Sequence, residues 1–91
     1  MPNNGADTLT DVEKTIYEDE DGCTSFSVKN KTDSAVNALI CVESLHGSEW
    51  FVIEPGDAHT FRSGDRGITK VNGKTASGTA NIYKGVVAIT D

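Results

Sequence analysis

Hydrophobic and polar residues alternate along most of the chain after residue 22, with a period of two that is typical of β-strands. In the first such segment, Phe26 and Val28 fall on one face, with serine and lysine on the other. Glycine, proline or clusters of polar residues separate the segments. The pattern predicts strands at 24–30, 36–45, 49–54, 58–63, 68–71, 79–83 and 86–90.

Three short segments predict turns between these strands. Pro55 and Gly56 fit a type II turn, because proline presets its own φ and glycine accepts the positive φ that follows. Asn72-Gly73 is a common two-residue hairpin loop, and Lys84-Gly85 is expected to join the last two strands. Seven or eight short strands without a long helix predict an all-β fold, a single small antiparallel sandwich or barrel.

Residues 9–17 fit two kinds of element. Leu9, Val12 and Ile16 have helical spacing, whereas Val12, Lys14 and Ile16 alternate as they would in a strand. The β-branched residues of this segment favour the strand.

The negative charge lies in the first 22 residues. The chain of 91 residues has a net charge of −6; residues 1–22 hold seven acids and one lysine, and residues 23–91 hold seven acids and seven bases. We therefore expect a flexible acidic N-terminal arm at 1–22 and a β-sandwich domain at 23–91. The sequence pI near 4.7 argues against nucleic acid and anionic membrane as partners.

Reactive residues form no recognisable catalytic motif in the sequence. Cys23 and Cys41 lie 18 residues apart without a CxxC pair, which argues against a zinc site. We expect two buried thiols, with a disulfide as the alternative if their strands are neighbours. Cys41, Glu43 and His46 lie close together, but a thiol on the most apolar strand should have a raised pKa and be a poor nucleophile. The prediction is a protein that is not an enzyme.

The acidic run Glu18–Asp21 resembles a calcium loop only in composition. If Gly22 takes the sixth position of such a loop, Tyr17 is the first and Val28 the twelfth, and neither can coordinate calcium. We expect a solvated charge cluster, with a loose, low-affinity calcium contact as the alternative. No phosphate-binding glycine motif is present, so neither a metal nor a cofactor is expected.

Two features are candidates for binding a partner. Trp50 could stack on a sugar or anchor a protein contact, but its strand is apolar on both faces, which favours a place in the core. The bases between 62 and 74 either form one positive patch, on which the acidic run of a neighbouring copy docks, or are dispersed surface charges. The candidate partner-binding residues are Trp50, Arg62, Arg66, Lys70, Lys74, Glu18, Asp19, Glu20 and Asp21.

An aromatic strand followed by a Pro-Gly turn spans Glu49–Asp57, and Phe61, Gly67–Val71 and Ala76–Ile82 follow it. This succession resembles the small all-β accessory proteins of tailed-phage virions, which are head-decoration and fibre-type domains. A second likeness, to aegerolysin-like small sandwiches, lies in Val28-Lys29-Asn30 and the same aromatic strand. Those proteins are typically longer and richer in aromatic residues.

The first resemblance implies a non-enzymatic structural component that stabilises or decorates a phage particle. Its partners would be copies of itself and a major capsid or other lattice protein, with a homo-oligomer, for example a trimer, as the expected state. The protein would lie in the host cytoplasm before assembly and in the virion afterwards. The N-terminus lacks the pattern of a signal peptide. The alternative is a carbohydrate- or lipid-binding sandwich, lectin- or aegerolysin-like, that uses Trp50.

Overall fold

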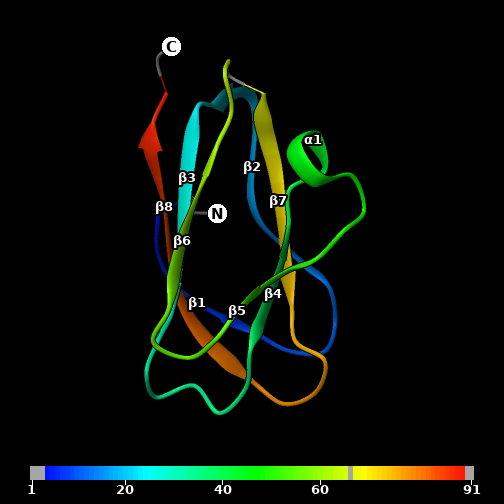
Figure 1. The fold of residues 1–91 in the computed structure, drawn as a ribbon, viewed down its shortest axis with the longest axis vertical. Coiled ribbons are helices and arrows are strands. Elements are labelled where there is room, and N and C mark those ends of the chain that lie inside the picture. Colours follow the sequence, from blue (N-terminus) through cyan, green and yellow to red (C-terminus); the bar gives the residue numbers. More distant parts are fainter. Residues whose placement is uncertain (1–3, 66, 90–91) are drawn as a thin grey trace.

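Two four-stranded antiparallel sheets pack face to face in the computed structural model, which describes residues 4–65 and 67–89 (Figure 1). Sheet I has the strand order β1 (Gly5–Leu9), β8 (Ala80–Ala88), β3 (Ser25–Asn30), β6 (Ala58–Arg62). Sheet II has the order β2 (Lys14–Cys23), β7 (Ile68–Lys74), β4 (Ala38–Cys41), β5 (Phe51–Ile53). A single helical turn, α1 (Glu43–His46), lies between β4 and β5. The predicted all-β sandwich is confirmed.

Most connections carry the chain from one sheet to the other. Only β4 and β5 follow each other within the same sheet, through α1. As a consequence, strands pair with partners far away in the sequence: β1 pairs with β8, and β2 pairs with β7. The first and last strands of the described residues therefore lie side by side in sheet I.

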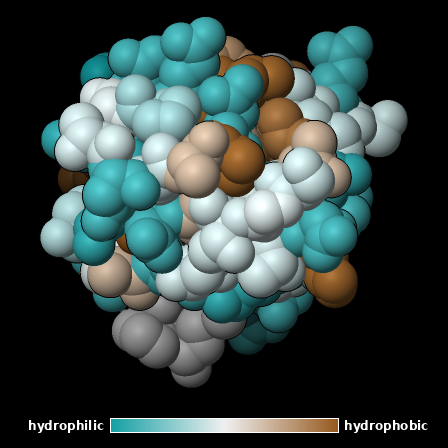
Figure 2. Space-filling view, turned by 90° about the horizontal axis from the view of Figure 1, so that it is seen from below, coloured by the Kyte–Doolittle hydropathy of each residue, from teal (hydrophilic) through white to brown (hydrophobic). Residues whose placement is uncertain are grey.

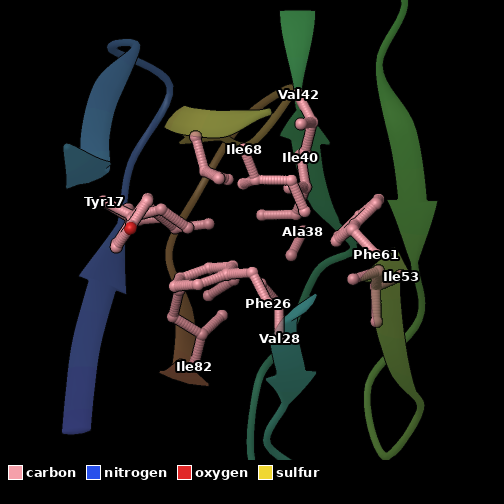
Figure 3. Packing of buried hydrophobic residues seen from close by; sticks show 14 of the residues in the cluster. Tyr17, Phe26, Val28, Ala38, Ile40, Val42, Ile53, Phe61, Ile68 and Ile82 are labelled. Atoms are coloured by element: carbon pink, nitrogen blue, oxygen red, sulfur yellow. The ribbon is translucent and has the colours of Figure 1, made fainter. Parts of the chain in front are cut away.

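The core lies between the sheets and consists of the inward-facing residues of both. Figure 3 shows Phe26 near its centre, with Tyr17 on one side and Ile40 and Ile68 above it. The rings of Tyr17 and Phe26 are 4.9 Å apart between centroids. Alternation thus predicted the inward face of β3 correctly, because Phe26 and Val28 are both fully buried.

The expectation of a flexible acidic arm at 1–22 is wrong for the residues that the structure describes. Residues 5–9 form β1 and residues 14–22 lie in β2, so this segment contributes one strand to each sheet. Leu9, Ile16 and Tyr17 are each at most 1% exposed and belong to the core. Burial of these three side chains outweighs the mutual repulsion of the acids, and no boundary separates an arm from a domain at residue 22.

The hairpin expected at Asn72-Gly73 is absent, because β7 runs through both residues without a turn. A hairpin of this kind needs a positive φ, and Gly73 does not have one. Instead, Gly73 makes room for the core: a Cβ there would lie 2.9 Å from a methyl group of Leu9. Asn72 accepts a hydrogen bond from the Thr15 hydroxyl and donates one to Glu13. Tertiary contacts therefore override the local turn preference.

Two other predicted boundaries also differ from the structure. The strand expected at 36–45 is only Ala38–Cys41, because residues 43–46 form α1. The two strands expected around Lys84-Gly85 are one continuous strand, β8, in which Lys84 is buried. By contrast, the type II turn is confirmed: Gly56 has a φ of 90°, and the Asp57 amide donates to the Glu54 carbonyl at 2.9 Å.

We expect Gly73→Ala to lower the free energy of unfolding by about 1–3 kcal/mol, since the new methyl group would overpack the core against Leu9 and Ile40. Urea denaturation followed by circular dichroism measures the change. Gly64→Ala is the matched control, because a Cβ at Gly64 meets no atom within 4 Å. Equal stability of the two variants would contradict the close packing at Gly73.

Candidate functional site

A buried charged cluster closes the side of the sandwich where β1 and β2, the edge strands of the two sheets, lie. Lys84 on β8 points inward, with its side chain only 3% exposed, and its ammonium is 2.9 Å from a carboxylate oxygen of Asp7. The same ammonium donates a hydrogen bond of 2.7 Å to the carbonyl of Ile16 in the opposite sheet. The Lys14 ammonium, on a half-exposed side chain, binds the other carboxylate oxygen of Asp7. The cluster thus joins both sheets.

The position of Ile16 explains why a lysine is buried here. The register of β2 and β7 shifts between Thr15 and Tyr17, which leaves Ile16 without a ladder partner in β7. Its carbonyl therefore needs another donor, because an unsatisfied buried carbonyl is costly. Lys84 supplies that donor, and Asp7 compensates the buried charge.

The Asp7 carboxylate stays ionised despite its burial. Burial alone would raise its pKa, but hydrogen bonds from Lys14, Lys84 and the Thr8 amide more than offset this effect. The pKa of Asp7 falls from 3.8 to about 2. The carboxylate and the two ammonium groups therefore form an ion-pair cluster at every pH near neutrality.

Asn30 forms a second polar connection between the sheets. Its side-chain amide donates to the carbonyls of Val36 and Ile53 at 3.0 and 2.9 Å, although Asn30 itself lies on β3 of sheet I. Its backbone amide and carbonyl bind Asp57 and Gly56. Asn30, the last residue of the strand predicted at 24–30, is thus fully buried and holds the Pro-Gly turn in place.

Trp50 lies outside the core cluster and is half-buried, so the expectation of a core tryptophan is wrong. The Lys74 ammonium lies over its ring, 4.4 Å from the centroid. This contact covers one face of the indole ring. A sugar could stack on that face only if Lys74 moved away.

The four predicted bases do not form a single patch within the described residues. Arg62 is on β6 in sheet I, whereas Lys70 and Lys74 are on β7 in sheet II. Arg66 lies outside the described residues. The spacing in sequence was misleading because the chain crosses between the sheets after β6.

The acidic run Glu18–Asp21 lies on β2 beside a base of its own chain. Glu18 stands opposite Lys70 in the ladder between β2 and β7. Glu20 and Asp21 are exposed, and Asp19 accepts a hydrogen bond from the Asp21 amide. Among the described residues, no group of three or more His, Cys, Asp or Glu side chains is arranged to hold a metal ion.

Three of the side chains able to react, those of His59, Cys23 and Cys41, are packed within the fold. His59 stacks on Phe51 at 4.1 Å between ring centroids and meets the edge of Phe61 at 4.7 Å. Both Cys23 and Cys41 are buried thiols. Burial and the nearby carboxylates of Glu43 and Glu13 raise the pKa of Cys41, as the sequence predicted.

Two shallow hollows lie on the surface. The first, which we call the apolar groove, has a volume of about 410 Å³ and lies over the outer face of β4 and β5. Figure 2 looks from below at the loops that border it and shows a small group of hydrophobic residues among hydrophilic ones. The apolar groove is lined by Ala35, Val36, Asn37, Leu39, Val52, Ala76 and Ser77.

The second hollow, which we call the basic hollow, has a volume of about 320 Å³ and lies where β3 and β8 meet the loop after β3. It is lined by Lys29, Lys31, Thr32, Asp33 and Tyr83. The Lys31 ammonium lies 4.3 Å from the centroid of the Tyr83 ring. Two lysines beside an exposed aromatic ring favour an anionic ligand.

Comparison with known proteins gives no match: no family model, no curated protein and no solved structure matches this chain. In the described part of the chain, helix length and hydropathy fall short of what a membrane-spanning helix requires.

We expect the stability of the protein to fall steeply as the pH drops from about 4 to about 2. Because the folded state holds the pKa of Asp7 at about 2, below its ordinary 3.8, its contribution is complete above pH 4 and is lost as Asp7 becomes protonated. The gap corresponds to about 2 kcal/mol. Urea unfolding at several pH values should show a steeper fall for the wild type than for Asp7→Asn. Exposed Asp11→Asn is the control and should keep the wild-type slope.

We expect Lys84→Met to cost at least about 3 kcal/mol of stability, because it leaves the Ile16 carbonyl buried without its donor and takes one ammonium from Asp7. Lys14→Met removes the other ammonium from a half-exposed position and should cost about 1 kcal/mol or less. Chemical denaturation of both variants provides the comparison. Equal losses would mean that the Ile16 hydrogen bond contributes nothing.

Proposed function

We propose that this chain is a non-enzymatic structural component of a larger assembly, and that the assembly is a phage particle that it decorates or stabilises. The observation that carries the proposal is the apolar groove on the outer face of sheet II, lined mainly by Leu39, Val52, Val36 and alanines. Removal of such hydrophobic surface from water by a neighbouring protein lowers the free energy, so exposed apolar surface of this kind favours association. Val52 itself is 51% exposed.

The use of the ionisable residues supports a structural role. Asp7 and Lys84 neutralise each other and join the sheets, and His59 is packed against two phenylalanine rings. The raised pKa of Cys41 keeps it a thiol near neutral pH. Asp7, Lys84 and His59 are thus used to stabilise the fold.

The choice of a phage particle rests on the resemblance within residues 49–82. Its aromatic strand and Pro-Gly turn correspond to β5 and the turn that leads into β6. The two-sheet fold is compatible with that resemblance. A carbohydrate-binding role for Trp50 is less well supported, because Lys74 already covers one face of its ring.

Gradient sedimentation of lysates from phage-producing cells of the native host tests the proposal. We expect an antibody against this chain to detect it in the band of intact particles. If the protein stays at the top of the gradient, the proposal fails. Titration with glycans or lipid vesicles, followed by tryptophan fluorescence, tests the alternative: the emission of Trp50 should not change, and a saturable shift would favour the binding module instead.

A further inference from the structure

The outward face of sheet I is positively charged. Side chains along a strand alternate between the two faces, and one set from each strand of sheet I is directed toward sheet II. Lys29 and Arg62 belong to the outward, exposed set. All residues of the four strands are described, and their one carboxylate, Asp7, is bound to Lys84 on the inward side. The face therefore carries cations without acids among its strands.

This positive charge is densest at the basic hollow. Lys29 stands opposite Tyr83 in the ladder between β3 and β8, and Lys31 reaches over the same ring. Asp33 is the single acid in the lining. Tyr83 is 50% exposed, so the hollow offers a ring surface together with two ammonium groups.

The acidic run Glu18–Asp21 is the densest negative segment of the chain, with four adjacent carboxyl groups. It lies on β2, an edge strand of sheet II, where the ladder with β7 is interrupted between Glu18 and Cys23. Both ion pairs found among the described residues involve Asp7 instead. The carboxylates of Glu20 and Asp21 are exposed on this edge.

The acidic run and the basic hollow lie toward opposite ends of the molecule. Figure 1 shows the end of β2 at the top and the loop after β3 at the bottom, along the longest axis of 36 Å. Charges so far apart hardly attract each other, because the screening length at physiological salt is about 8 Å. The two surfaces therefore cannot neutralise each other within one molecule, but they can meet between two.

We propose that a second copy of this chain docks the acidic run of its β2 into the basic hollow. The contact is heterologous, since it joins two different surfaces, and repetition of it generates a ring or a filament. This inference rests on the proposed role in an assembly, and it names a second copy of the chain as the partner of the basic hollow. The apolar groove stays available for a lattice protein.

Sedimentation velocity of the purified full chain at about 0.15 M salt, over a range of concentrations, tests the contact. We expect concentration-dependent oligomers for the wild type. Lys29→Glu with Lys31→Glu places like charges opposite each other, and Glu18→Lys with Glu20→Lys leaves the run without net charge. Each should weaken association at least about tenfold. Circular dichroism checks that both variants keep the fold.

The decisive sample is an equimolar mixture of the two double variants. The first variant keeps the native acidic run and the second keeps the native basic hollow, so the mixture should regain association that neither variant shows alone. Glu43→Lys with Glu49→Lys changes the net charge as much as Glu18→Lys with Glu20→Lys does, at exposed positions outside both surfaces. This control should keep the wild-type association.

A wild type that stays monomeric at all concentrations, or a mixture that stays monomeric, would overturn the head-to-tail contact. So would a loss of association in the Glu43 and Glu49 control, because net charge alone would then decide it. If the chain bands with phage particles yet shows no self-association, this inference fails while the proposed function stands. If it forms the head-to-tail oligomer but never bands with particles, the contact stands and the phage assignment fails.

Discussion

The hydrogen bond from the Lys84 ammonium to the Ile16 carbonyl is the constraint on which the N-terminal half of the sandwich depends. A bulge in β2 leaves this carbonyl without a ladder partner, and Lys84 reaches it from the opposite sheet. A lysine buried in this way requires a carboxylate, and Asp7 provides it. The acidic residue thereby holds β1 in place, so the first strand is bound through both its backbone ladder and its charge.

The same cluster protects two edges of the sheets. Both β1 and β2 end a sheet, and unpaired edges invite pairing with other chains. An inward-pointing charge at Asp7 disfavours the addition of another strand, and so do the bulge and the acids of β2. Backbone pairing of another strand along these edges is therefore disfavoured, so contacts with other chains use side chains and not an extended ladder.

The period of two predicted the fold class and the inward residues of β3, because alternation directly reports which side of a sheet is buried. The prediction from sequence failed at positions whose structure depends on contacts with residues far away in the chain. Asn72-Gly73 and Lys84-Gly85 read as turns, yet Leu9 and Ile16, far away in sequence, require them within strands. Alternation of Ile82, Lys84 and Val86 could have placed Lys84 inward. No local signal identified Asp7 as its partner or located the basic hollow, since both depend on strand order.

The pairing of the first strand with the last also affects the synthesis of the protein. Because β8 lies between β1 and β3, sheet I has no continuous ladder until residues 80–88 have emerged from the ribosome. Until then β1 lacks the strand that it pairs with, so Leu9 cannot take its place in the core. Folding should therefore be slow for a domain of this size, because long loops must close before the contacts that stabilise the sheet can form.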